Sequence, residues 1–186
     1  MRNNQIVQFV SFITSSEPET FLPAWKKYAR EEMFPKNEPI LLQRQSGSRN
    51  KFQYLSRHSW PEGEDCFSFK TSRKQGYFPE FPVQIQHIGG FIPVETVPAC
   101  FQKENKHRLL VLAEQDDCEP SRPDGQPLVY RCNRYQAFYE SCRYAQVTEF
   151  FGDSESLETI AGFYRLKPGT EAVLLRDCRI LLAKKH

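Results

Sequence analysis

Residues 5–13 read Gln-Ile-Val-Gln-Phe-Val-Ser-Phe-Ile, and this stretch decides the fold because it is apolar on both sides. Successive side chains of a strand point to opposite faces, so Val10 and Phe12 share one face while Val7 and Phe9 share the other. A strand that is apolar on both faces must be covered on both faces. We therefore expect a sheet that carries helices on one face and packs against a second sheet on the other.

The residues after this strand continue the pattern of a ferredoxin-like unit. The segment Ser16–Glu19 has the form of a capping box with Pro18 in the first turn, and it opens a helix predicted over about 17–34. Three strands are predicted after it, and a short helix is allowed within about 63–75, between the last two of them. These strands are expected at 40–45, 51–60 and 83–91, which gives the order β-α-β-β-(α)-β.

The second half of the chain repeats this order with a different gap. Residues 95–106 are polar and suit a linker, and residues 114–127 are expected to form an exposed loop rich in turn residues. Asp153 or Ser154 can cap a helix, whereas the periodicity of residues 128–142 does not separate a strand from irregular chain. The remaining strands are expected at 108–113, 144–151 and 171–183, which gives β-(loop)-β-β-α-β.

Each half therefore has the order of a ferredoxin-like unit. We predict an α+β fold in which two β-α-β-β-α-β units pack their antiparallel sheets as an α+β barrel. The first unit is expected at residues 1–95 and the second at 107–186, with a linker at 96–106. Such a barrel can close within one chain or between two, so the chain is expected to be a monomer with an intrachain barrel or a homodimer.

The composition points to a small partner of low charge. The chain has 186 residues, and 25 Lys and Arg stand against 23 Asp and Glu, a formal charge of +2. This balance gives no electrostatic reason to expect nucleic acid or a membrane as the partner. No apolar stretch suits a signal peptide or a spanning helix, so we expect a cytoplasmic protein. The six cysteines lack the close spacing of zinc and redox motifs, and we expect them to be reduced and mostly buried.

Four segments within residues 5–94 are distinctive, namely Val7–Phe12, Glu17–Phe21 with Trp25 behind it, His58–Pro61 and His87–Phe91. In these segments the sequence resembles the dimeric α+β barrel superfamily, which includes antibiotic-biosynthesis monooxygenases, stress-responsive barrel proteins and haem-degrading monooxygenases. For the cofactor-independent oxygenases of the group, the resemblance implies an enclosed pocket with a few polar groups and no metal. For the haem-degrading members, it implies an axial His on the helix after the hairpin, but residues 62–75 contain no His.

One strand of the first half presents the most informative candidate site. Tyr54, Ser56, His58 and Trp60 alternate onto one face, which is expected to line either the barrel interior or the helix-covered side. His87 lies on the last strand of the same half. Because imidazole changes its charge near neutral pH, His58 and His87 are our candidate catalytic residues, as a base, a haem ligand or a substrate anchor. The structural alternative is a half-buried His that a hydrogen bond satisfies.

Further candidates for ligand binding come from the same strands and from a second polar cluster near residue 140. These candidates are Arg44, Tyr54, Trp60, Tyr139 and Cys142. Cys142 could pair with a distant His as a nucleophile, but a thiolate needs an activating cation or helix terminus, and the sequence offers only Arg143. The motifs of nucleotide, phosphate and zinc-hydrolase sites are absent, so we expect no cofactor and no metal.

Two main functional hypotheses follow. The first is a protein that binds a small organic molecule in an apolar, aromatic-lined pocket, with or without catalysis, such as a cofactor-independent monooxygenase or isomerase. The second is a non-catalytic structural or interaction protein with a packed barrel interior, and haem binding is a third. The 15 Phe, 8 Tyr and 2 Trp suit either of the first two, because rings line pockets and fill cores. A void of about 300 Å³ or more beside His58 or His87 would favour the first hypothesis.

Overall fold

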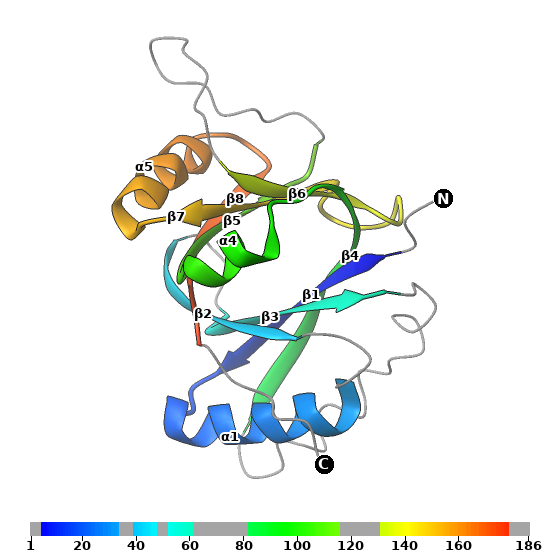
Figure 1. The fold of residues 1–186 in the computed structure, drawn as a ribbon, viewed down its shortest axis with the longest axis vertical. Coiled ribbons are helices and arrows are strands. Elements are labelled where there is room, and N and C mark those ends of the chain that lie inside the picture. The colour runs from blue at the N-terminus through cyan, green and yellow to red at the C-terminus, as the bar shows by residue number, and fades with distance from the viewer. Residues whose placement is uncertain (1–4, 34–38, 48–51, 62–81, 116–130, 179–186) are drawn as a thin grey trace.

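Eight strands of a single chain close into a barrel in the computed structural model, which describes residues 5–33, 39–47, 52–61, 82–115 and 131–178 (Figure 1). The order around the barrel is β1-β3-β2-β8-β5-β7-β6-β4, and the paired strands are antiparallel. The barrel therefore closes within one chain. The strands are β1 (Ile6–Thr14), β2 (Ile40–Gly47), β3 (Tyr54–Trp60), β4 (Val83–Glu95), β5 (His107–Ala113), β6 (Cys132–Ala137), β7 (Gln146–Gly152) and β8 (Thr170–Asp177).

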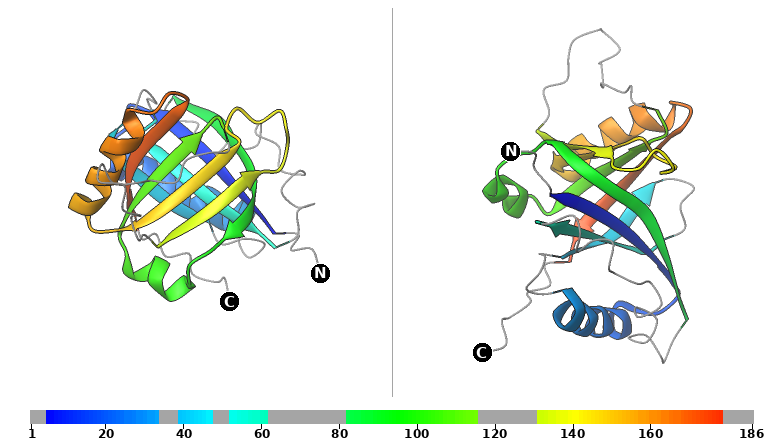
Figure 2. Two further views of the ribbon diagram at one scale, coloured as in Figure 1. Left: turned by 90° about the horizontal axis from the view of Figure 1, so that it is seen from above. Right: turned by 90° about the vertical axis from the view of Figure 1, so that its right-hand side faces the viewer.

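Two helices lie on opposite sides of the barrel, and the right-hand view of Figure 2 shows α1 below it and α5 above it. The helix α1 (Pro18–Tyr28) continues into a π-helical turn, η1 (Ala29–Met33), which confirms the helix predicted over 17–34. The helix α5 (Ser154–Arg165) begins after Asp153, whose side chain accepts a hydrogen bond from a backbone N–H, as the predicted cap requires. A shorter helix, α4 (Ala99–Glu104), lies between β4 and β5.

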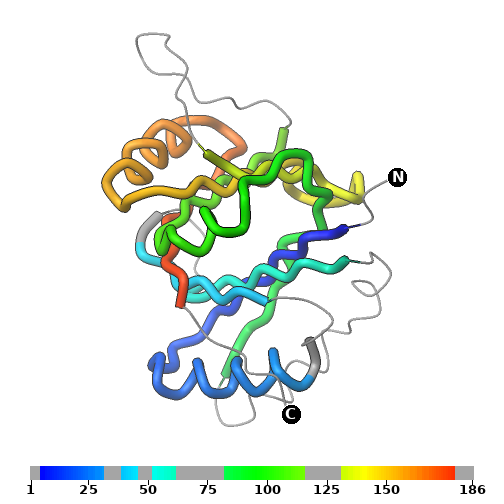
Figure 3. The backbone as a smooth tube through the Cα atoms, viewed as in Figure 1, coloured from blue at the N-terminus to red at the C-terminus, as the bar shows by residue number. Residues whose placement is uncertain are grey.

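Both halves of the chain have the strand order of a ferredoxin-like unit. In the first half the order is β4-β1-β3-β2, and in the second half the corresponding strands follow as β8-β5-β7-β6. Two seams join the halves, because β2 pairs with β8 and β4 pairs with β6. Figure 3 shows β4 in green, running from the first half towards the second. The structure confirms the predicted α+β barrel, while the exact bounds of the two units stay a prediction.

The core has three layers, and β1 contributes to two of them. Val7 and Phe9 point into the barrel, where they pack with residues of all the other strands. Val10 and Phe12 point outward and pack against α1. A third cluster lies between α5 and the outer face of the second sheet. The two-sided covering predicted for residues 5–13 is therefore confirmed.

The structure differs from the expectation in three segments. The strand predicted at 83–91 continues to residue 95, because β4 leaves β1 and pairs with β6 through a bulge after Pro93. Part of the predicted linker forms α4, and the undecided stretch 128–142 contains β6. Three expectations lie mostly or wholly outside the described residues: the helix within 63–75, the loop 114–127 and the chain end at 179–183. In the part of the chain that is described, no helix is long and apolar enough to cross a membrane.

Candidate functional site

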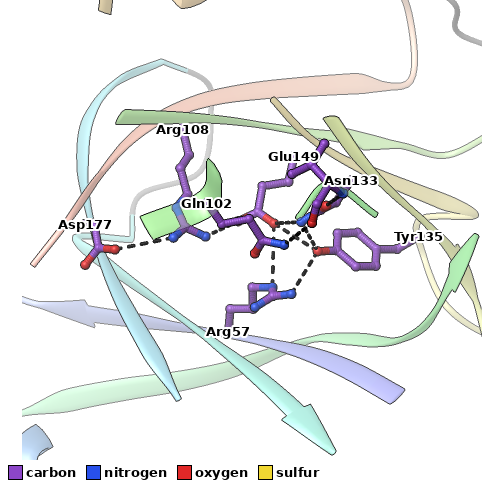
Figure 4. Close-up of polar contacts among 8 residues, drawn as sticks. Arg57, Gln102, Arg108, Asn133, Tyr135, Glu149 and Asp177 are labelled. Atoms are coloured by element: carbon purple, nitrogen blue, oxygen red, sulfur yellow. Dashed lines mark hydrogen bonds and ion pairs between the residues drawn. The ribbon is translucent and has the colours of Figure 1, made fainter. Parts of the chain in front are cut away.

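A charged network fills one end of the barrel interior, beside α4 (Figure 4). Glu149 of β7 is fully buried, and Arg108 of β5 donates a hydrogen bond to its Oε1 at 2.6 Å. Arg57 of β3 approaches the other carboxylate oxygen, with 3.6 Å between Nε and Oε2. Arg108 also pairs with Asp177 of β8 at 3.4 Å. Two cations thus face two carboxylates, and the charges of the network balance.

Neutral side chains complete this network. The hydroxyl of Tyr135 donates to Glu149 Oε2 at 2.9 Å and accepts a hydrogen bond from Arg57 at 3.1 Å. The amide of Asn133 donates to the same carboxylate oxygen at 2.9 Å and to the Tyr135 hydroxyl at 2.8 Å. Its carbonyl oxygen accepts from the backbone N–H of Val97 at 2.8 Å, which ties the segment before α4 to the network. Buried charges are stable only when they are paired and hydrogen-bonded in this way.

The protonation states in the network follow from burial and from the arginines. Burial, with the nearby Glu149 carboxylate, raises the pKa of Tyr135, so its hydroxyl keeps the proton that it donates. Burial alone would raise the pKa of Glu149, but the positive charges of Arg108 and Arg57 outweigh this effect and lower it to about 2. Glu149 is therefore ionised at neutral pH with both oxygens engaged. Glu149 is thus buried and hydrogen-bonded through both oxygens within the network.

The depressed pKa of Glu149 predicts a loss of stability in acid. A carboxyl group with a lowered pKa in the folded state contributes stability above its ordinary pKa of 4.5, and loses it as the pH falls towards about 2. We expect the free energy of unfolding of the wild type to exceed that of Glu149→Gln at neutral pH, and the difference to shrink over this window. Urea unfolding at several pH values measures both. A difference that stays constant from neutral pH to pH of about 2 would contradict the assignment.

Sequence reasoning did not predict this network. Arg57, Arg108 and Glu149 each place a single charge at a buried, inward-facing position of a strand. Side chains alternate between the two faces of a strand, so the sequence pattern could have placed these three charges on the inward face. A charge on a buried face needs a partner on the same face of a neighbouring strand. Among the described residues, no group of His, Cys, Asp and Glu could hold a metal ion.

The two predicted catalytic histidines lie on either side of β1. Gln8 stands opposite His58 in the strand register, and its Nε2 lies 3.0 Å from Nδ1 of His87 on β4. His58 is fully buried with its Nε2 2.6 Å from the hydroxyl of Ser56, whereas His87 is exposed. This histidine row lies on the outer face of the barrel, because the neighbouring Phe9 points inward. The sequence left open whether these side chains line the barrel interior or the helix-covered side, and the structure places them on the outer, helix-covered side. A catalytic role for His58 and His87 stays a prediction.

Three of the predicted ligand-binding residues lie apart from one another. Tyr54 stacks on Phe21 of α1 with 4.2 Å between the ring centroids, and burial raises its pKa. Trp60 is buried at the far end of the same strand. Arg44 stands on β2 opposite Leu175, on the side that faces the barrel interior. The fold thus gives these side chains different neighbours, and their role in binding stays a prediction.

The other two predicted residues lie on the turn between β6 and β7. Tyr139 is exposed, and its ring contacts that of Phe138 at 4.9 Å. Cys142 is half-buried beside Gly89, where a Cβ would approach its Sγ to 3.3 Å. The four described cysteines form no disulfide with one another. The expectation that the cysteines are mostly buried is wrong for these four, because only Cys132 is buried. Cys66 and Cys118 lie outside the described residues.

An open cleft of about 660 Å³ lies at the other end of the barrel, where β8 begins. Its volume falls within the roughly 300–1,000 Å³ of small-molecule sites. The side chain of Thr170 donates to the carbonyls of Tyr164 and Lys167 at 2.9 and 2.6 Å, which caps the C-terminal end of α5 beside the cleft. None of the predicted site residues lines the cleft. The lining of the cleft consists of Glu114, Arg143, Arg165, Leu166, Lys167, Pro168, Gly169, Thr170, Glu171 and Ala172.

The lining of the cleft carries three cations against two carboxylates. Arg143 pairs with Glu114 at 3.3 Å and with Glu171 at 3.4 Å, and its side chain is 63% exposed. The hydroxyl of Tyr144 also donates to Glu171, at 2.8 Å. The ammonium group of Lys167 lies 4.5 Å from the ring centroid of Phe163, which holds it near the rim. The cleft is therefore polar. Its own lining holds one more positive than negative charge, and Glu158, outside the lining, pairs with Arg165.

Comparisons with known proteins give a likeness of fold. No protein-family model matches the chain, and no curated protein matches it. Two solved structures of mutant chlorite dismutases from Candidatus Nitrospira defluvii are similar to it. Both superpose with a TM-score of 0.52 over 94% of this chain and 92% of theirs, at 10% identity for one and 9% for the other. This chain therefore has an α+β barrel fold similar to that of chlorite dismutase.

Proposed function

We propose that the chain binds a small organic anion, with a carboxylate as the recognised group, in the cleft between α5 and β8. The observation that carries the proposal is a cleft of suitable size whose lining holds an excess of cations. Lys167 is the cation that we assign to the ligand carboxylate, because Arg143 already pairs with Glu114 and Glu171. Leu166, which is 85% exposed, and Pro168 supply apolar contact for a carbon skeleton.

The barrel interior does not compete for this ligand, because side chains fill it. The ring of Phe9 meets those of Phe91 and Tyr135 at centroid distances of 5.9 and 5.7 Å in the middle of the barrel. The charged network occupies the end beside α4. These contacts favour the packed interior of the second hypothesis over an apolar pocket inside the barrel, and they support a ligand site at the surface.

The cleft supports recognition better than catalysis. Glu114 and Glu171 are engaged by Arg143, and Glu171 also accepts from Tyr144, so both carboxylates are already partnered. The lining residues include no imidazole and no thiol. A monooxygenase or isomerase activity remains a hypothesis that depends on the histidine row of His58 and His87.

The histidines that the structure describes lie away from the cleft. His58 is fully buried and its Nε2 lies against Ser56, while His87 binds Gln8 through Nδ1. His107 is half-buried at the start of β5, and none of these three residues lines the cleft. No step of the proposed function therefore depends on haem.

A charge reversal in the cleft tests the proposal. We expect acetate, succinate or citrate to shift amide resonances of residues 165–172 saturably in NMR titrations, and Lys167→Glu to weaken this binding about tenfold or more, because a charge-assisted hydrogen bond is lost. Succinamide, which has the same skeleton without the charges, should not bind. Inorganic phosphate and chlorite complete the panel, the latter because the similar structures are chlorite dismutases.

The matched control is Lys106→Glu, which makes the same change in charge on an exposed side chain at the opposite end of the barrel. It should leave the affinity within about twofold, since a distant surface charge is screened by salt. Equal weakening by both variants would show nonspecific attraction and would overturn the proposal. Shifts confined to Gln8 and His87 would move the ligand site to the histidine row.

A further inference from the structure

Exposed apolar side chains gather on one face of the barrel, over the seam between β4 and β6. In the described part of the chain, five large apolar side chains are at least 36% exposed, and four of them belong to this face. They are Ile92 (36%), Val94 (65%), Phe138 (42%) and Tyr139 (46%). We call this surface the β4–β6 face and define it by these four residues together with Glu95, Arg134 and Gln136.

The strand pairing makes the β4–β6 face continuous. Ile92 stands opposite Gln136, and the backbone N–H of Phe138 donates to the carbonyl of Gly90, which lies on the same side of β4. Val94 stands at the bulge of β4, one residue beyond Pro93, which pairs with the inward-facing Tyr135. Neither α1 nor α5 packs here, because α1 packs against the outer face of the first sheet and α5 packs on β5, β7 and β8.

The charges on this face identify the kind of partner. Arg134 pairs with Glu95 at 3.4 Å, so the face carries one cation and one anion beside its apolar residues. A surface with both signs and no net charge can complement a copy of itself across a two-fold axis. It offers no positive excess for nucleic acid. Strand addition is also excluded, because all eight strands of the closed barrel have two neighbours and present no free edge.

We propose that the β4–β6 face binds the same face of a second copy of this chain, so that two closed barrels form an isologous dimer. Aromatic and branched apolar residues surrounded by polar ones are the usual composition of such interfaces. The rings of Phe138 and Tyr139 contact each other at 4.9 Å and form a large apolar anchor. This inference does not depend on the ligand proposed for the cleft.

Sedimentation velocity from about 1 to about 100 µM tests the proposal, in the range where interfaces of modest affinity dissociate. The wild type should form a dimer whose fraction rises with protein concentration. Val94→Glu should raise the dissociation constant of the dimer about tenfold or more, because the new charge would be buried in the interface without a partner. The matched control is Thr159→Glu, which adds the same charge to the exposed side of α5 and should leave the dimer unchanged. A wild type that is monomeric at about 100 µM would overturn the proposal, as would equal effects of the two variants.

A charge-swap experiment separates a lost interface from a lost fold. Glu95→Arg makes the face purely cationic and Arg134→Glu makes it purely anionic, so each variant should dimerise more weakly than the wild type. An equimolar mixture of the two should associate more strongly than either alone. Failure of the mixture to associate, with both variants folded by circular dichroism, would contradict the proposal. Association of a different protein with the wild-type monomer would likewise count against a second copy as the occupant.

Discussion

Glu149→Gln is expected to lower the free energy of unfolding by about 3–5 kcal/mol, the cost of breaking a buried ion pair by removing one partner. The substitution conserves shape, but Arg108 and Arg57 keep their charges in the barrel interior and lose the carboxylate that they share. An uncompensated buried cation costs more than the hydrogen bonds that glutamine retains. Urea unfolding at neutral pH measures the loss.

The matched control for this substitution is Glu158→Gln, which breaks the exposed ion pair between Glu158 and Arg165. Pairs of this kind contribute at most about 1 kcal/mol, since water already solvates both charges. If the two variants lost similar amounts, the interior network would contribute no more than a surface pair. Our account of the barrel interior would then be wrong.

Phe9→Ala is expected to cost about 3–5 kcal/mol, because it removes a ring from the middle of a packed barrel. Phe9 is fully buried, stands opposite Arg57 in the strand register and contacts the rings of Phe91 and Tyr135. The residues around it belong to closed strands that cannot move inward far enough to fill the space. The loss should be measured by urea unfolding with Phe163→Ala as the control.

Phe163 is only half-buried on α5, so its truncation should destabilise the protein clearly less. A small loss for Phe9→Ala would indicate that the barrel interior has room to accommodate the change. That outcome would revive the hypothesis of an internal ligand pocket. Large losses of unfolding free energy for both Glu149→Gln and Phe9→Ala would show that side chains fill the barrel interior at its charged end and at its apolar centre.

The sequence was most informative where one residue's neighbours along the chain determine its structure. The alternation within residues 5–13 predicted a strand that is covered on both faces, and the structure places Val7 and Phe9 inside and Val10 and Phe12 outside. The cap of α5 at Asp153 was predicted for the same reason, since it depends on a hydrogen bond to a residue three positions away.

The sequence was least informative where strands distant in the chain meet. The network joins Arg57, Arg108 and Glu149 from three strands, and no local pattern sets their mutual register. The cleft depends on contacts of Arg143 with Glu114 and Glu171, which lie 29 and 28 residues from it on either side along the chain. His58 and His87 were expected as a pair of candidates, but their placement on either side of Gln8 required the pairing of both strands with β1.

The two seams of the barrel also bear on how the chain folds. The seam between β2 and β8 joins the most distant strands, because Leu42 stands opposite Asp177. The other seam joins closer segments, with Phe91 opposite Ala137. Until both seams form, β2, β4, β6 and β8 are edge strands with unpaired backbone groups. A partly folded chain therefore exposes four sites for pairing with other chains, although the finished barrel has none. Slow closure of the barrel and aggregation of partly folded chains are the expected consequences of this topology.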